Sequence, residues 1–230
     1  MKVVSATAGC LVTLEGGEGA GKSTQIRLLQ QWLLRAGLSV TLTREPGGTP
    51  LGEQLRNLLL DPTLGALTPS AEMLLFSAAR AEAVQQVIRP ALERGDVVLS
   101  DRFVDSSLVY QGYGLGLDLG FIRSVGRQVC AGVWPDLTLV LDLPPEVGAQ
   151  RRSAARTRVD RIEARGPDYH LRVRRGYLDL AVHEPERVRV VDASRRAEAV
   201  QQEIRRQVAD VLRVCGLPVS VLEEGGGGAT

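Results

Sequence analysis

The chain has 230 residues, a length that suits one α/β domain with a substantial core. Its 44% hydrophobic and 24% charged residues are ordinary for a soluble globular protein, and no apolar run approaches the length of a membrane span. The formal net charge of +1 gives no global attraction to nucleic acid or to a membrane, so neither partner is expected.

Three cysteines, Cys10, Cys130 and Cys215, lie far apart along the chain in apolar contexts. Their spacing is not that of metal ligands, so we expect reduced core residues of a cytoplasmic protein. We expect residues 1–9 to form an N-terminal extension and residues 10–216 a single domain. Residues 217–230, which include a run of glycines, are expected to be a flexible tail.

The first predicted strand, Cys10–Glu15, leads directly into a glycine-rich segment. Gly16–Ser23 reads Gly-Gly-Glu-Gly-Ala-Gly-Lys-Ser and fits the phosphate-binding pattern G-x-x-x-x-G-K-[ST]. A helical pattern follows over Lys22–Ala36 and stops at Gly37, a residue type that often follows a helix. Strand, glycine loop and helix in this order are the context in which the pattern binds a nucleotide.

The residue types of this loop suit phosphate. Glycines let backbone N–H groups converge on phosphate oxygens, and the helix N-terminus adds partial positive charge. Lys22 can reach the β- and γ-phosphates, and the Ser23 hydroxyl can ligate magnesium. We therefore predict a nucleotide-binding site made of Gly16, Gly17, Glu18, Gly19, Ala20, Gly21, Lys22, Ser23 and Thr24.

Further strands and helices alternate along the rest of the chain. Strands are predicted at Ser39–Thr43, Asp96–Asp101, Leu137–Asp142 and Val188–Asp192. Helices are predicted at Leu51–Leu60, Pro69–Arg94, Asp118–Ala131, Pro167–Val182 and Arg195–Cys215. This alternation predicts a five-stranded parallel sheet covered by helices on both faces, a three-layer α/β/α fold.

Polar residues close several of these strands, at the sheet edge where open parallel sheets bind ligands. Asp101 ends a buried strand and is predicted to hold magnesium together with Ser23, while Arg102 is placed to clamp a second phosphate. A salt-bridged strand end is the alternative interpretation of Asp101 and Arg102. Asp142 ends its strand in the same way, so the pattern alone does not choose between the two acids.

Arginines crowd the segment after Asp142, with only two acids nearby. They are Arg151, Arg152, Arg156, Arg158 and Arg161. We interpret residues 149–163 as an arginine-rich lid over transferring phosphates, because phosphoryl transfer depends on electrostatic stabilisation and exclusion of water. A basic helix exposed to solvent is the alternative.

The motifs together resemble the bacterial thymidylate kinases, a family of P-loop nucleoside monophosphate kinases, and the similarity extends from Leu11 to about Leu212. The phosphate loop by itself would identify only a superfamily, but four further blocks in the right order make the resemblance specific. The phosphate loop lies within Glu15–Thr24, and the four further blocks are Thr43–Thr49, Leu75–Arg80, Asp101–Ser107 followed by Tyr110-Gln111-Gly112, and Pro135–Asp142.

The resemblance implies a P-loop NTPase-type fold and transfer of phosphate from ATP with Mg²⁺ to dTMP, which yields dTDP for dTTP biosynthesis. It implies that Phe76 stacks on thymine, that Arg80 donates to its O4, and that Ser107 and Gln111 contact the base. Tyr110 would crowd a ribose 2′-hydroxyl. Glu18 would lie near the 3′-hydroxyl, and the acceptor phosphate would be held by Arg44, Arg56 and Arg102.

The phosphate loop carries no basic residue at Gly19 or Ala20, which resembles the bacterial class in which the lid supplies the transition-state cation. The catalytic residues implied are Lys22, Arg102, Arg152 and Arg156, with Arg158 as a third lid candidate. Family resemblance also implies a homodimer through the helix Pro69–Arg94, which has apolar residues on more than one side.

Two other functions remain open from the sequence. One is a kinase for another nucleoside monophosphate or for a deoxynucleoside. The other is a nucleotide-dependent switch, although the Asn-Lys-x-Asp tetrad of a guanine-reading GTPase does not occur in the chain and an arginine-rich lid would be surplus to a simple sensor.

Overall fold

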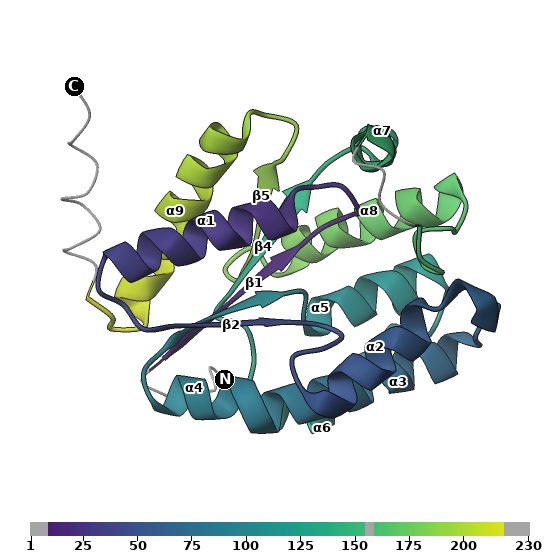
Figure 1. Cartoon of the computed structure of the whole chain (residues 1–230), viewed down its shortest axis with the longest axis horizontal. Coiled ribbons are helices and arrows are strands. Elements are labelled where there is room, and N and C mark those ends of the chain that lie inside the picture. Colours follow the sequence, from purple (N-terminus) through teal and green to yellow (C-terminus); the bar gives the residue numbers. More distant parts are fainter. Residues whose placement is uncertain (1–8, 155–158, 219–230) are drawn as a thin grey trace.

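The computed structural model describes residues 9–154 and 159–218, so the expected N-terminal extension and C-terminal tail lie almost entirely outside the described residues. These residues form a five-stranded sheet in the order β2-β3-β1-β4-β5, and every neighbouring pair of strands is parallel (Figure 1). The strands are β1 Cys10–Glu15, β2 Val40–Arg44, β3 Val97–Asp101, β4 Leu137–Asp142 and β5 Val188–Asp192. The predicted parallel sheet is confirmed, with strand ends within one residue of those expected.

Helices cover both faces of the sheet, which confirms the predicted three layers (Figure 1). Helices α1 and α9 lie on one face, and α3, α4, α6 and α8 lie on the other. The bounds are α1 Lys22–Arg35, α2 Pro50–Leu60, α3 Pro69–Ala83, α4 Arg89–Glu93, α5 Val104–Ser107, α6 Leu119–Cys130, α7 Pro145–Ala154, α8 Pro167–His183 and α9 Ala197–Val214. Within the described ranges, no helix has the length and apolar character needed to cross a bilayer.

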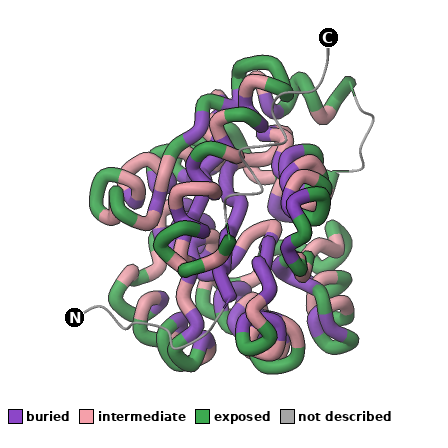
Figure 2. The backbone as a smooth tube through the Cα atoms, turned by 90° about the vertical axis from the view of Figure 1, so that its left-hand side faces the viewer, coloured by how far each residue is buried: buried purple, intermediate pink, exposed green. Residues whose placement is uncertain are grey.

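The central strands carry the core, and buried positions concentrate along them in Figure 2. All six residues of β1 are buried, as expected for a strand with parallel neighbours and helices on both faces. Successive side chains alternate between the two faces, so Val12 packs toward α1 and α9, whereas Leu11 packs toward α4 and the segment before it. Burial on both faces fixes the strand register and hence the positions of the strand ends.

The predicted helix over Pro69–Arg94 is interrupted. The chain is α-helical to Ala83, π-helical over Val84–Ile88 and α-helical again from Arg89. Pro90 has no N–H to donate, and its ring would collide with the carbonyl four residues earlier in a regular α-helix. The wider π turn immediately before Pro90 relieves this conflict. The residues are helical, as predicted, but the helix is not uniform.

The register brings the polar strand ends to one edge of the sheet. Asp101 of β3 lies opposite Leu14 of β1 on one side and opposite Arg44 of β2 on the other. Glu15, the last residue of β1, lies opposite Val140 of β4. The loops that follow the carboxyl ends of these strands therefore lie close together over the middle of the sheet.

A buried ionic network fixes β4 and the segment before β5 beneath this edge. Asp105 of α5 is fully buried and pairs with Arg187 at 2.6 Å. The Thr138 hydroxyl donates to the same carboxylate at 2.7 Å, and the Thr13 hydroxyl donates to Thr138 at 3.0 Å. The network therefore links β1, β4, α5 and the entry to β5 through one carboxylate.

Removal of the cation from this network should destabilise the protein strongly. Arg187→Ala leaves Asp105 as a buried, unpaired charge, a change that typically costs about 3–5 kcal/mol. Urea unfolding followed by circular dichroism measures the effect. Arg206→Ala is the matched control because its side chain is 67% exposed where it pairs with Glu203, and it should change stability little. Equal effects of the two variants would contradict a structural role for the network.

Candidate active site

The loop between β1 and α1 needs glycine at particular positions. Gly16 and Gly21 have φ angles of +132° and +90°, in the region that disfavours residues with a side chain. A Cβ on Gly16 would lie 2.5 Å from the carbonyl oxygen of Leu141. The Lys22 ammonium donates to the carbonyls of Gly16 and Gly17 at 3.1 and 2.9 Å, so its charge lies directly over the loop.

The two residues predicted to hold a metal are brought together. The Ser23 hydroxyl donates to the Asp101 carboxylate at 3.3 Å, because the loop follows β1 and Asp101 ends the adjacent β3. Asp142, the alternative acid from the sequence, instead accepts two hydrogen bonds from Arg174 at 2.8 and 2.9 Å. The carboxylate beside the phosphate loop is therefore that of Asp101.

Two adjoining cavities over the sheet edge contain most of the predicted site residues. The first, of about 430 Å³, is lined by the phosphate loop, Ser23, Asp101 and Arg44. The second, of about 150 Å³, is lined by side chains that include Phe76. The two cavities share the lining residues Glu18, Glu45, Arg56 and Arg102. Ligands in the two cavities would thus meet at a boundary that carries two arginines.

Arg102 occupies this boundary in an unusual backbone conformation. Its φ is +73°, a region that a residue with a side chain adopts at a cost of about 1–3 kcal/mol. The guanidinium forms an ion pair with Glu18, donates to the Gly16 carbonyl at 3.1 Å and lies 4.8 Å from the centre of the Tyr110 ring. These contacts hold the guanidinium in place between the two cavities.

The charge of Arg102 controls the acid beside it. Burial alone would raise the pKa of Glu18, but the charges of Arg102 and Lys22 and a hydrogen bond from Tyr110 lower that pKa to about 2. The Tyr110 hydroxyl donates to Glu18 at 3.2 Å. Glu18 is therefore ionised at neutral pH and acts as a hydrogen-bond acceptor at the cavity boundary.

A fully buried carboxylate supports this arrangement from below. Glu15 accepts from the Phe103 N–H at 2.8 Å, the Ser106 hydroxyl at 2.6 Å and the Tyr177 hydroxyl at 2.7 Å. Burial raises the pKa of Glu15 despite the nearby charge of Arg102. Tyr177 was not predicted as a site residue, because its spacing from Val173 on α8 is that of an ordinary apolar helix face.

The second cavity contains most of the residues expected to contact a base. Phe76, Ser107, Tyr110 and Gln111 all line it. Arg80 does not line it, since its guanidinium pairs with the buried Glu45 at 2.8 Å and donates to the Ser107 hydroxyl at 3.0 Å. The structure therefore places Arg80 behind Ser107, where it can position that hydroxyl.

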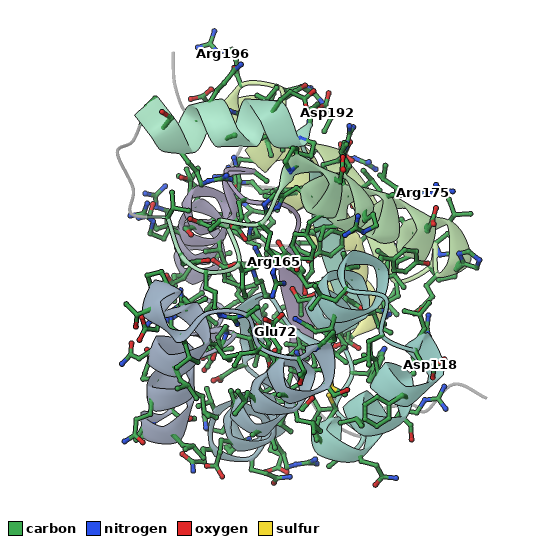
Figure 3. All side chains as sticks on the ribbon, turned by 90° about the vertical axis from the view of Figure 1, so that its right-hand side faces the viewer. Glu72, Asp118, Arg165, Arg175, Asp192 and Arg196 are labelled. Carbon is green, nitrogen blue, oxygen red and sulfur yellow. The ribbon has the colours of Figure 1, made fainter. Side chains whose placement is uncertain are left out.

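Glu72 is a second residue that the sequence analysis missed. This fully buried carboxylate of α3 accepts from the Gln111 amide at 2.9 Å and pairs with Arg165 at 2.6 Å and Arg161 at 2.7 Å. The labels of Arg165 and Glu72 lie close together near the middle of Figure 3, in agreement with this ion pair. A sequence signal was available, because residues 72, 76 and 80 follow one another at the four-residue spacing of one helix face.

The arginines of the predicted lid have different environments. Arg151 and Arg152 belong to α7 and line the first cavity. Arg161, by contrast, is buried against Glu72 and donates to the Leu59 carbonyl at 2.9 Å, so it ties its segment to α2 and α3. It does not line the first cavity. Arg156 and Arg158 lie outside the described residues.

Helix α7 packs closely on the phosphate loop through two glycines. A Cβ on Gly148 would collide with the Glu18 carbonyl oxygen, and a Cβ on Gly19 would collide with the Gly148 carbonyl oxygen. Neither position can accept a side chain without movement of the backbone. The start of the predicted lid is thereby held against the loop.

Arginines also line the other side of the first cavity. Arg44 ends β2 and pairs with Glu53 at 2.9 Å, and Arg56 of α2 donates to the Pro46 carbonyl at 2.9 Å. Both line the first cavity, and Arg56 also lines the second. The site therefore combines a phosphate loop, a hydroxyl–carboxylate pair, and cations on both sides of one boundary, which suits the approach of two anionic ligands.

Comparison with known proteins identifies the family. The thymidylate kinase family model matches residues 14–204. The chain is 53% identical over 201 residues to a thymidylate kinase of Symbiobacterium thermophilum, in an alignment that covers 87% of this chain and 93% of that protein. It is 50% identical over 202 residues to a thymidylate kinase of Deinococcus radiodurans, covering 88% and 97%.

A solved structure agrees with the sequence comparisons. The crystal structure of thymidylate kinase from Ehrlichia chaffeensis superposes with a TM-score of 0.69 and 33% identity, over 87% of this chain and 98% of that one. The resemblance drawn from the motifs is confirmed, and the chain belongs to the thymidylate kinase family of nucleoside monophosphate kinases.

Proposed function

We propose that this protein transfers the γ-phosphate of ATP to dTMP and so produces dTDP and ADP. The observation that carries the proposal is the boundary between the two cavities, where Arg56 and Arg102 are shared. Two nucleotides bound with their phosphates toward this boundary would meet there. Family membership supplies thymidylate as the acceptor, because the relatives at about half identity are named thymidylate kinases.

ATP would bind in the first cavity, with its phosphates over the loop Gly16–Thr24 and the Lys22 ammonium at the β- and γ-phosphates. The residues present fit magnesium, since a hydroxyl and a carboxylate are hard oxygen donors and the Ser23 and Asp101 oxygens are 3.3 Å apart. When bound, Mg²⁺ neutralises charge on the phosphates.

The acceptor would bind in the second cavity. Phe76 supports stacking on the base, and the Ser107 hydroxyl and Gln111 amide supply polar contacts to its edge. Tyr110 would exclude a 2′-hydroxyl and Glu18 would accept from the 3′-hydroxyl. Arg44, Arg56 and Arg102 would hold the phosphate. The role of Arg80 follows from its partners: through Ser107 it would position a base contact.

Transfer needs no general base, because the attacking phosphate oxygen of dTMP is already ionised. Lys22 and Arg102 neutralise charge that develops on the transferring group, and Arg152 extends this field from α7. Arg156 remains proposed as a further lid cation by analogy with the family. The contacts that fix Arg102 before substrate arrives supply the preorganisation on which such electrostatic catalysis depends.

The organisation of the molecule is proposed on similar grounds. We propose a single domain over residues 10–216 with a lid at about 149–163, a cytoplasmic location and a homodimer. The dimer is supported by apolar side chains on the outer helices, since Leu74 of α3 and Phe121 of α6 are 49% and 41% exposed. Helices α3 and α6 contact one another, so these side chains belong to neighbouring elements of the same layer.

A substrate panel tests the proposed function. With ATP and Mg²⁺, ADP release should be fastest with dTMP and much slower with UMP, dCMP, GMP and thymidine. The deoxyribose and the base should both be selected, because Tyr110 and Phe76 line the same cavity. Faster turnover of another monophosphate, or of thymidine itself, would assign a different kinase activity to the site.

Arg102→Ala should lower kcat with dTMP by at least about tenfold, equivalent to about 1.4 kcal/mol of transition-state stabilisation. The substitution removes the guanidinium shared by both cavities and leaves Glu18 without its ion-pair partner. Steady-state kinetics measures the effect. Arg175→Ala is the control, because the Arg175 side chain on α8 is 81% exposed, and it should turn over normally. Normal turnover of Arg102→Ala would remove this residue from the transfer step.

Glu72→Gln should weaken dTMP binding specifically. Glu72 only accepts hydrogen bonds, so it fixes the Gln111 amide with its nitrogen toward α3. Loss of a charge-assisted hydrogen bond, about 1.5–3 kcal/mol, predicts an increase of about tenfold or more in KM for dTMP. KM for ATP should remain within about twofold. Glu203→Gln on α9 is the control, because Glu203 lines neither cavity. If Glu72→Gln lowered kcat alone and left KM for dTMP unchanged, the role of Glu72 would be purely structural.

A further inference from the structure

Two cysteines and an acid converge at the edge of the sheet opposite the active site. Cys10 begins β1, Asp136 immediately precedes β4, and Cys215 follows the last turn of α9. The two Sγ atoms and a carboxylate oxygen of Asp136 all lie within 4.8 Å of one another. The spacing of the cysteines along the chain did not indicate this cluster, because three separate elements supply its members.

The cluster consists of two thiols and a carboxylate, and no basic side chain of the described residues pairs with that carboxylate. Asp136 accepts the Leu11 N–H at 2.8 Å with one carboxylate oxygen, Oδ2, and its carboxylate also takes part in a hydrogen bond with the Cys10 thiol. Among residues 9–154 and 159–218, no lysine, arginine or histidine forms an ion pair with Asp136. Cys10 is fully buried, whereas Asp136 and Cys215 are half-buried and connect the cluster to solvent. A positive charge placed among these groups would meet three donors and an open approach.

The donors define which cation fits. Thiolates favour soft and borderline ions, and two sulfurs with one carboxylate form a set that suits Zn²⁺ or Cd²⁺ and not Mg²⁺. Neighbouring ligand atoms of a tetrahedral zinc ion lie about 3.3–3.8 Å apart, given bond lengths of about 2.0–2.3 Å. The three donor atoms are at most 4.8 Å apart, so a contraction of about 1–1.5 Å would bring them to the separations of zinc ligands.

We propose that Cys10, Asp136 and Cys215 form a binding site for a thiophilic divalent cation, with water as the fourth ligand. Binding converts both thiols to thiolates and releases two protons to solvent, with no change in oxidation state. The ion would join the starts of β1 and β4 to the end of α9. This site is separate from the phosphate loop, which follows the other end of β1.

Titration of the reduced, metal-free full chain tests the proposal. Calorimetry should show one Zn²⁺ bound per chain. Added Cd²⁺ should produce the ultraviolet absorption band of thiolate-to-metal charge transfer. Cys215→Ser and Asp136→Asn should each lower the affinity by at least about tenfold, since even indirect partners of metal ligands contribute that much. Because the charge-transfer band reports sulfur ligands only, cation binding at Ser23 and Asp101 does not contribute to it.

Cys130→Ser is the matched control. Cys130 is also buried, but it lies in a different core cluster from Cys10 and Cys215. This variant should bind Cd²⁺ as the unaltered chain does. Zn²⁺ should also raise the unfolding temperature of the chain and of Cys130→Ser, but not that of Cys215→Ser, by linkage of binding to the folded state.

Three results would overturn the proposal. The first is no charge-transfer band in the reduced chain, and the second is a band that Cys215→Ser retains at full intensity. The third is formation of a Cys10–Cys215 disulfide on addition of hydrogen peroxide, seen by peptide mass, from a reduced chain that binds no Cd²⁺. Asp136→Asn keeps both thiols, so it decides the matter if Cys215→Ser fails to fold.

Discussion

The ion pair between Arg102 and Glu18 is the interaction on which the rest of the site depends. Glu18 belongs to the phosphate loop after β1, and Arg102 follows β3, so the pair joins two adjacent strands at their carboxyl ends. Tyr110 contributes its ring to Arg102 and its hydroxyl to Glu18. One guanidinium thereby forms the wall between the two cavities, and its position is set by residues that belong to both.

Acidic residues hold the arginines of the site in position and at the same time reduce their net charge. Glu15, Glu18, Glu45 and Glu72 are all buried or half-buried, and each accepts a hydrogen bond from an arginine or from a residue that contacts one. A chain with a formal net charge of +1 can in this way gather cations at one edge of its sheet. Because the arginines are ordered before a ligand binds, little reorganisation is needed when phosphate charge arrives.

Much of the fold could be predicted because it depends on local patterns. Buried strands that end in polar residues, and glycine after α1, placed strand and helix ends within one or two residues of those observed. The uniform helix over Pro69–Arg94 was wrong in detail, since the consequence of Pro90 for the preceding turn depends on how a long helix accommodates a missing donor.

Site residues could be predicted where they belong to a sequence motif. They could not be predicted where their role depends on a contact with a residue distant in the sequence. Ser23 and Asp101 lie together as expected, and the resemblance named most side chains that line the second cavity. Arg161 was grouped with the lid arginines, but its buried partner Glu72 lies far from it in the sequence. The cluster of Cys10 and Cys215 could not be predicted either, because a periodic pattern carries no information on contacts between distant elements.

The contact between Gly19 and Gly148 has a mechanical consequence. Backbone touches backbone there, without an intervening side chain that could rotate to absorb a shift. Arg151 and Arg152 come three and four residues after Gly148, within about one helical turn. The glycine pair therefore sets the distance between α7 and the phosphate loop, and with it how far these two guanidinium groups extend over the triphosphate position. A single added methyl group at either glycine would change that distance.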